Sequence, residues 1–148
     1  MDNLQLIPIS LSNINFLDKT EYKNLSTENR KALVNDSNRR QCKGEYFCFY
    51  LIKDNLKRVG VINMCGHGRE VVSVAPEILE EYRSKGYAKR SLLLAYSIAK
   101  ELGFKKVTAG IREDNVVSQK LHEKLGFEFV GTTISKRGNL LKNYVMNL

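Results

Sequence analysis

The residue types best suited to chemistry lie in one basic, glycine-containing segment near the middle of the chain. Residues 83–88 read R-S-K-G-Y-A, follow a strand-like stretch and open a long amphipathic helix. A helix start leaves its first backbone N–H groups unpaired and carries about half a positive charge, so it can bind a phosphate. Gly86 and Ala88 are small enough to let a phosphate approach these amides. The surrounding basic side chains add positive charge: Arg83, Lys85 and Lys89.

The glycine spacing excludes two common phosphate-binding motifs. The P-loop pattern G-x-x-x-x-G-K-[S/T] is missing, and so is the three-glycine fingerprint of dinucleotide-binding folds. Short glycine motifs often arise by chance, so Gly86 could equally ease a turn while the basic residues remain solvated. The segment alone leaves both interpretations open.

The apolar pattern predicts a mixed α/β fold around this segment. Strands are expected at residues 4–9, 45–52, 58–64, 71–79, 106–111, 127–135 and 140–147. Two helical pieces are expected between residues 11 and 41, the second capped by Ser26. A helix should run from Ala88 to the glycine at 103, and another should start at Asp114 or Asn115. The expected order is β-α-α-β-β-β-α-β-α-β-β.

Local signals predict the turns and one helix face. The first hairpin is expected to turn at residues 53–55, and Gly66 is expected in the next turn. Pro76 is expected to interrupt the strand 71–79. A spacing of four predicts the buried face of the last helix: Val117, Leu121 and Leu125.

Length and composition restrict the class of protein. The 148 residues, 43% hydrophobic and 27% charged, predict one domain over residues 1–148 without long disorder. No apolar run approaches the roughly 20 residues of a membrane span, and no secretory leader is recognisable, so a cytoplasmic protein is expected. Three cysteines without C-x-x-C spacing predict neither a metal site nor a disulfide framework.

The net charge of +8 is compatible with an anionic partner, since net charge bears on association and not on fold. A nucleic-acid-binding protein is one alternative, because five basic residues cluster early in the chain: Arg30, Lys31, Arg39, Arg40 and Lys43. No nucleic-acid motif accompanies them, so nucleic acid is the weakest hypothesis.

Two blocks together resemble the GCN5-related N-acetyltransferase (GNAT) superfamily. R-S-K-G-Y-A matches its Arg/Gln-x-x-Gly-x-Gly/Ala signature, and N-V-V-S-Q-K-L-H-E-K-L-G-F at residues 115–127 resembles its Asn-x-x-Ala/Ser…Lys-x-Gly-Phe helix. The Asn-x-x-Ser form is closest to the ribosomal-protein-alanine N-acetyltransferase-like branch. The resemblance spans about residues 45–131 and implies a GNAT fold: a mixed sheet of about six to seven strands, splayed between strands four and five.

The resemblance implies acetyl-coenzyme A bound in that splay. The pyrophosphate would lie on the amides of residues 84–89, and the pantetheine would pair like a strand along Ile78–Glu80. Asn115 and Ser118 would face the cofactor. The implied binding residues are Ile78, Leu79, Glu80, Arg83, Ser84, Lys85, Gly86, Tyr87, Ala88, Lys89, Asn115 and Ser118.

It also implies that an amine attacks the thioester directly in a ternary complex, with a backbone N–H near Ile78 steadying the oxyanion. An amine must first lose its proton, which a carboxylate or a water chain can take. Glu77 is the first candidate base, although it could equally be a solvated residue of the acidic run Glu77, Glu80 and Glu81, and Glu45 is a weaker candidate. His122 occupies the position of the tyrosine that often protonates the leaving thiolate, although water could do the same. Tyr144 is a further residue that could come near the site.

The sequence leaves the acceptor open between a small molecule and a peptide amino group. A homodimer is common in such folds, but no interface is readable. The departure at His122 keeps a second hypothesis open, a non-catalytic module that binds acetyl-coenzyme A.

Overall fold

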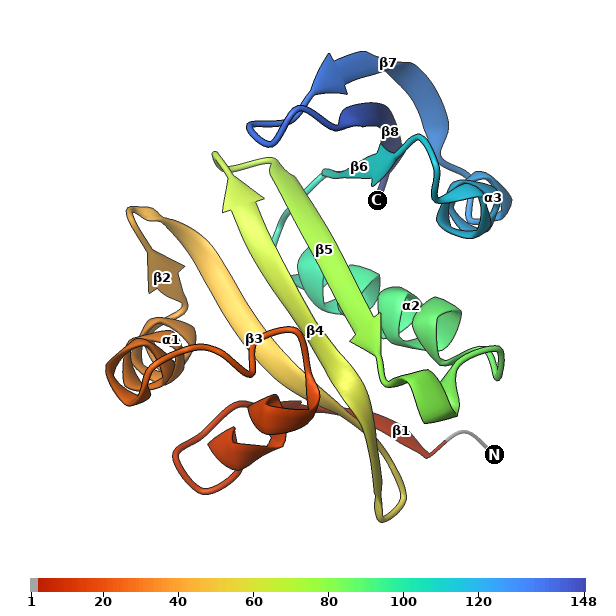
Figure 1. The fold of residues 1–148 in the computed structure, drawn as a ribbon. Helices are drawn as coiled ribbons and strands as arrows, with labels where there is room; N and C mark the ends of the chain where they lie inside the picture. The colour runs from red at the N-terminus through yellow and green to blue at the C-terminus, as the bar shows by residue number, and fades with distance from the viewer. Residues whose placement is uncertain (1–2) are drawn as a thin grey trace.

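One mixed sheet runs through residues 3–148, the part of the chain that the computed structural model describes (Figure 1). Its strands are β1 Leu4–Pro8, β2 Gln41–Cys42, β3 Glu45–Asp54, β4 Lys57–His67, β5 Val71–Ile78, β6 Lys106–Arg112, β7 Glu128–Ile134 and β8 Leu140–Asn147. Seven of them follow the order β1-β3-β4-β5-β6-β8-β7, and the two-residue β2 pairs with β3 outside that path. The expected mixed α/β fold is confirmed, with β2 as an unexpected short addition.

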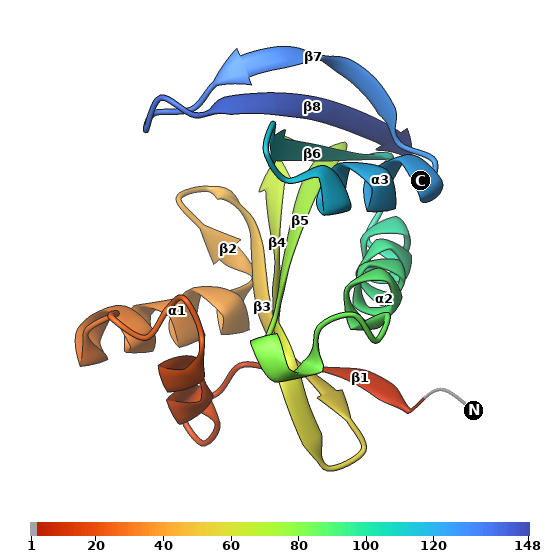
Figure 2. The same cartoon turned by 45° about the vertical axis from the view of Figure 1, so that its right-hand side comes forward.

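Helices cover both faces of the sheet. They are the 3-10 helices η1 Ile14–Lys19 and η2 Glu80–Tyr82, and the α-helices α1 Thr27–Arg39, α2 Tyr87–Glu101 and α3 Val116–Lys124. Figure 2 shows η1 and α1 on one side of the central strands and α2 on the other. Ser26 caps α1 as expected, because its hydroxyl accepts a 3.1 Å hydrogen bond from the Asn29 N–H. None of the helices in residues 3–148 has the length and apolar character needed to cross a bilayer.

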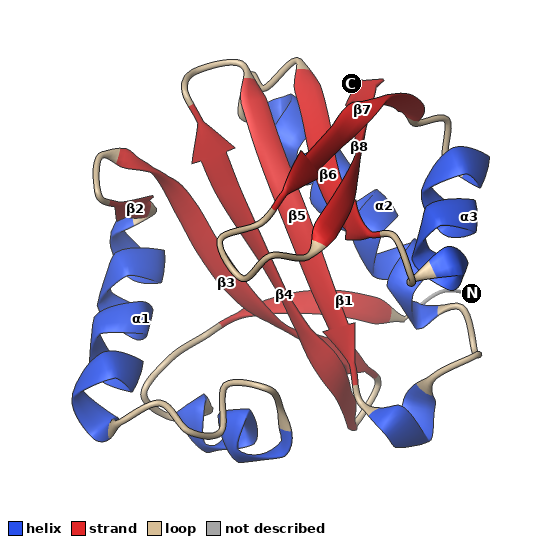
Figure 3. Ribbon diagram, turned by 45° about the horizontal axis from the view of Figure 1, so that its top comes forward, coloured by secondary structure: helices blue, strands red, loops and turns tan. Residues whose placement is uncertain are grey.

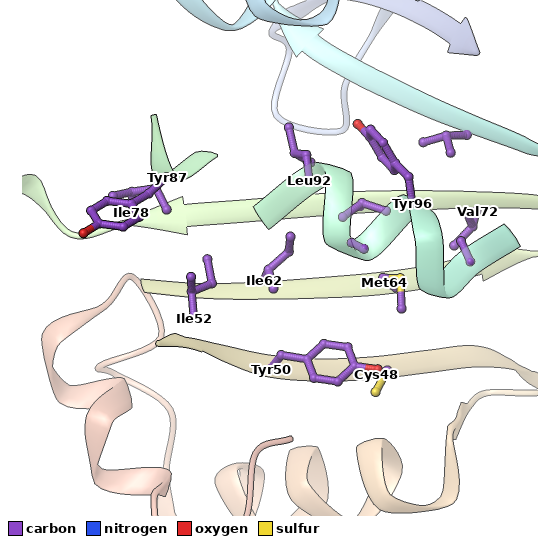
Figure 4. Close-up of a cluster of buried hydrophobic side chains, with 14 of the residues drawn as sticks. Cys48, Tyr50, Ile52, Ile62, Met64, Val72, Ile78, Tyr87, Leu92 and Tyr96 are labelled. Atoms are coloured by element: carbon purple, nitrogen blue, oxygen red, sulfur yellow. The ribbon is translucent and has the colours of Figure 1, made fainter. Parts of the chain in front are cut away.

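The alternation of apolar residues along the strands produces two cores. On one face, Cys48, Tyr50 and Ile52 of β3 belong to the cluster that packs against α2 (Figure 4). On the other face, Phe49 and Leu51 belong to the cluster under η1 and α1. The sheet is therefore fixed from both sides, and any site at its strand ends has a rigid base.

The sheet opens between β5 and β6, the fourth and fifth strands expected from the sequence. These two strands pair in parallel only where Val71–Ser73 of β5 lie beside residues 106–108 of β6. Beyond Ser73, β5 keeps its partner β4, and no strand of residues 3–148 pairs with its other side. Figure 2 shows β6, β8 and β7 lying across the end of β4 and β5, and Figure 3 shows β5 running on past the end of β6. The predicted splay is confirmed.

Three local expectations are wrong, each for a physical reason. β5 continues through Pro76, because the edge left unpaired there does not need the missing N–H. β3 runs to Asp54, so the hairpin turns at residues 55–56 instead of 53–55. Gly66 lies within β4, where a Cβ would come 3.0 Å from the Cβ of Tyr46.

The buried face of α3 also differs from the expectation. Val117 is 83% exposed, whereas the polar residues Gln119 and His122 are buried. Leu121 and Leu125 are only half-buried. The apolar spacing therefore identified the helix correctly but placed its buried side incorrectly, because two polar side chains make hydrogen bonds inside.

We expect Gly60→Ala to destabilise the protein, because a Cβ at Gly60 would lie 2.1 Å from the backbone carbonyl oxygen of Glu77. Relieving that clash pushes β5 off β4 and costs about 1–3 kcal/mol, seen as a melting temperature lower by several degrees. Gly110→Ala is the matched control, since its Cβ meets nothing closer than 3.4 Å. Equal melting temperatures for the two variants in a thermal melt would contradict this prediction.

Candidate functional site

The loop before α2 has the shape expected of an anion site. Gly86 is the N-cap of α2 with φ +83°, and open space surrounds the position that its Cβ would take. The first backbone bond of the helix runs from the Arg90 N–H to the Gly86 carbonyl at 3.1 Å, so the amides of residues 87–89 have no partner within the helix. The first turn carries no acidic residue. Ser84 also has a left-handed backbone, with φ +63°.

The basic side chains of this loop are less mobile than the sequence suggests. Nε of Arg83 donates a 2.9 Å hydrogen bond to the carbonyl of Ile78, which holds the guanidinium at the end of β5. The ammonium of Lys85 lies 5.8 Å from the centre of the Tyr82 ring. The hydroxyl of Tyr87 bonds the carboxylate of Asp54, at the tip of the hairpin between β3 and β4. These contacts anchor the loop to the sheet.

The unpaired edge of β5 lies earlier in the chain than the expected pantetheine-binding segment Ile78–Glu80. The Leu79 N–H donates a 2.9 Å bond to Val59, so it faces β4, and Glu80 already belongs to η2. Because successive backbone groups alternate in direction, the N–H and carbonyl of Ile78 face away from β4. The edge that a ligand can pair with is therefore residues 74–78, a correction that moves it out of Leu79 and Glu80.

Glu77 is held in one orientation at the end of β5. Both of its carboxylate oxygens accept the Glu21 N–H, at 3.2 and 3.1 Å. The pKa of Glu77 is raised above its ordinary value, mainly because the carboxyl is partly buried and secondarily because the Glu21 carboxylate lies near it. The hydrogen bond from the Glu21 N–H and the charge of Arg83 offset part of this rise. Glu45, the weaker candidate, accepts the Gly68 N–H at the opposite end of β4, so the structure does not bring it to this site.

A cavity of about 870 Å³ opens beside Glu77, between the end of η1 and the segment from β5 to the loop before α2. Five carboxylates line it: Asp18, Glu21, Glu77, Glu80 and Glu81. Three cations face them: Lys19, Lys23 and Arg83. Because Asp18 is paired with Arg30 at 2.7 Å, four carboxylates stand against these three cations, which is a small excess of negative charge on a chain that is basic as a whole.

The start of α3 is organised by its own side chains. Asn115 is the N-cap and accepts a 3.1 Å bond from the Ser118 N–H through Oδ1. The hydroxyl of Ser118 lies 3.4 Å from Nδ1 of His122. Among the residues that the structure describes, the Nδ2 amide group of Asn115 makes no hydrogen bond. Within residues 3–148, no hydrogen bond or ion pair joins these residues to the loop before α2.

The surroundings of His122 do not favour the role of an acid. Nδ1 lies 2.8 Å from the Ser118 carbonyl, which can only accept, so Nδ1 carries the proton and Nε2 of the neutral ring carries none. Burial lowers the pKa of His122 below its ordinary value, and the hydrogen bond to the Ser118 carbonyl offsets only part of this. The ring also packs edge-on against Phe127. Tyr144 is buried on β8, with its hydroxyl 3.5 Å from Glu123.

The structure also shows the surroundings of one residue of the early basic cluster and of two cysteines. Arg30 is not a free charge of that cluster, because its guanidinium pairs with Asp18 at 2.7 Å and bonds two backbone carbonyls. Cys48 is buried in the sheet, and Cys65 has burial as the main cause of its raised pKa. The raised pKa of Cys65 lowers its thiolate fraction, so it is a weak nucleophile at neutral pH.

The sequence did not indicate three residues near the site. Glu21, 56 positions before Glu77, donates its N–H to the Glu77 carboxylate. The hydroxyl of Tyr22 accepts a 3.1 Å hydrogen bond from the side-chain amide of Asn63. Gln119 is buried behind the start of α3. No local pattern marks such residues, because chain folding alone brings them to the site.

The comparisons with known proteins agree with this geometry. The chain is 33% identical to the uncharacterized N-acetyltransferase YycN of Bacillus subtilis (strain 168) over 60 residues, which are 40% of this chain and 38% of YycN. Its fold is similar to that of the ribosomal L7/L12 alpha-N-protein acetyltransferase RimL in complex with coenzyme A: TM-score 0.82, 16% identity, covering 99% of this chain and 94% of RimL.

The spermidine N-acetyltransferase of Vibrio cholerae, in complex with coenzyme A and spermine, gives a TM-score of 0.81 at 16% identity, over 98% of this chain and 95% of that one. At these identities the likeness concerns the fold. The model of the acetyltransferase (GNAT) family matches residues 12–127, which is most of the chain. The sequence motifs, the splayed sheet and this match agree, and the chain belongs to the GNAT acetyltransferase family.

Proposed function

We propose that this protein transfers the acetyl group of acetyl-coenzyme A to a primary amine by direct attack in a ternary complex. The observation that carries the proposal is the free edge of β5 at residues 74–78, which leads through η2 to the open amides at Gly86. A ligand with an amide-containing arm and a diphosphate needs such an edge followed by such a helix start. Family membership supports the same assignment.

The residues present fit coenzyme A. The space at Gly86 and the amides of residues 87–89 accommodate a diphosphate, and Lys85 and Lys89 supply positive charge. For a pantetheine to bond the Ile78 carbonyl, the Arg83 side chain must release it. Asn115 and Ser118 contribute polar groups from α3.

Two groups of the chain serve the reaction. When bound, acetyl-coenzyme A supplies an activated acetyl thioester. The Ile78 N–H faces the free edge and donates to the acetyl oxygen as negative charge develops there. Glu77 accepts the proton that the attacking amine must lose, and its raised pKa brings it closer to the pH at which it works. Solvent protonates the departing thiolate, because Nε2 of neutral His122 has no proton to give.

The acidic cavity supports a cationic acceptor. Its carboxylates attract an amine that carries a second positive charge, and Glu77 lies on its wall. RimL is named for a protein amino terminus and the Vibrio cholerae enzyme for spermidine, so two proteins of this fold differ in acceptor. The cavity makes the polyamine-like class the first choice for this chain.

We expect thiol release from acetyl-coenzyme A with an aliphatic diamine at a kcat/KM about tenfold above that of a monoamine of equal length. The advantage should shrink in 0.5 M salt, because screening weakens attraction between exposed charges. The assay is a thiol-detection time course with both amines and a short peptide. Equal rates for both amines at low salt would exclude the cationic class, and cofactor binding without thiol release from any amine would favour the non-catalytic module.

A further inference from the structure

Gln119 is a buried polar side chain that the reaction does not use. It is 7% exposed in the middle of α3. Nε2 donates to the carbonyl of Arg112 at 3.0 Å and to the carbonyl of Glu113 at 2.8 Å. Oε1 accepts from the Lys142 ammonium of β8 at 3.4 Å. Two carbonyls and one ammonium leave a single orientation for the amide, and both of its hydrogens are used.

These bonds close the short connection between β6 and α3. The Arg112 carbonyl also accepts the Asn115 N–H at 3.0 Å, so one oxygen receives the backbone of the N-cap and the side chain of Gln119. Asn115 in turn caps the helix at the Ser118 N–H. The position of the N-cap thus depends on an amide that lies one turn further along the helix.

The contact with Lys142 joins this connection to the far half of the sheet. Lys142 pairs with Ile111 of β6 and Thr132 of β7, so its position is fixed by the strands beyond the splay. An apolar residue at 119 could fill the same space, but the Glu113 carbonyl would lose a donor. The Gln119 amide therefore joins the start of α3 to β8 through its hydrogen bonds to the Arg112 and Glu113 carbonyls and to Lys142.

We propose that Gln119 is a positioning residue, which holds the start of α3 where Asn115 and Ser118 meet the cofactor. This inference rests on the proposed function, because it takes acetyl-coenzyme A as the ligand of those two residues. Gln119 itself touches no reacting atom. Loss of the Gln119 amide should weaken the binding of the cofactor. The binding of the amine acceptor, on the other side of the splay, should stay unchanged.

The test is Gln119→Met, which keeps length and apolar volume but removes both donors. We expect the KM for acetyl-coenzyme A, and the Kd for coenzyme A by calorimetry, to rise about tenfold, as the loss of two hydrogen bonds predicts. The KM for the amine should stay within about twofold. Gln119→Asn keeps the amide on a side chain one methylene shorter, so it should give an intermediate value.

Lys120→Met is the matched control, because Lys120 is the neighbouring residue on the exposed side of α3. An unchanged Kd for coenzyme A in folded Gln119→Met overturns the inference. An equal rise of both KM values, or the lack of any folded variant at 119, also overturns it, since Gln119 would then serve folding alone. Failure of the wild type to bind acetyl-coenzyme A is a different result, and it refutes the proposed function itself.

Discussion

Gly86→Glu should abolish the thermal stabilisation that acetyl-coenzyme A gives the wild type. A ligand present at a hundred times its Kd stabilises the folded state by about 2.7 kcal/mol, which corresponds to roughly 8 °C for a chain of this size. The new carboxylate would project into the open space at Gly86, where a phosphate would have to lie, and like charges repel there. The measurement is a melting curve with and without millimolar cofactor.

Two variants separate charge from backbone strain. Gly86→Ala places a Cβ at a residue with φ +83°, which disfavours that backbone conformation but adds no charge. It should therefore lower the melting temperature but keep part of the shift that the cofactor gives. Gly103→Glu places the same side chain at a left-handed glycine, φ +96°, beyond the other end of α2. It should keep the whole shift. Loss of the shift in Gly103→Glu, or its survival in Gly86→Glu, would place the cofactor elsewhere.

Glu77→Gln should lower kcat by about a hundredfold, the lower range for loss of a positioned general base. The amide keeps the size of the side chain but cannot take the proton of the amine. Steady-state thiol release at saturating acetyl-coenzyme A measures this, and the KM for the cofactor should hardly change.

The pH dependence gives an independent check on Glu77. A base works only when deprotonated, so kcat/KM of the wild type should rise with pH through the pKa of Glu77, above the ordinary value for a glutamate because burial raises it. Glu77→Gln should lose this rise. Glu101→Gln is the control at an exposed glutamate of α2, remote from the cavity. Full activity of both Glu77→Gln and His122→Phe would leave proton transfer to water, and a hundredfold loss in Glu101→Gln would show that the loss in Glu77→Gln is not specific to the base.

The fold was largely predictable because each element carries its own signal. The spacing of apolar residues in α2, Ser26 at the start of α1 and the strand order around the two motifs need only neighbouring residues to be recognised. The failures have a common cause. Pro76 was expected to break a strand that in fact lies on an open edge, and α3 buries Gln119 and His122 where Val117 was expected. Whether Pro76 breaks β5 depends on the strand beside it, and the burial of Gln119 depends partly on Lys142 of β8, so neighbouring residues alone reveal neither.

The sequence alone determined the family and the charge of the chain, and it predicts an anion-binding loop at Gly86, since these depend on local residue types and spacing. Only the tertiary structure decided that Glu77 meets Glu21, that an acidic cavity exists on a basic protein, and that Arg83 bonds the end of β5. These contacts join segments up to 56 residues apart, and packing of η1 and η2 at the end of the sheet creates them. Long-range packing has no local pattern, so the sequence predicts where the cofactor loop lies but not what surrounds the acceptor.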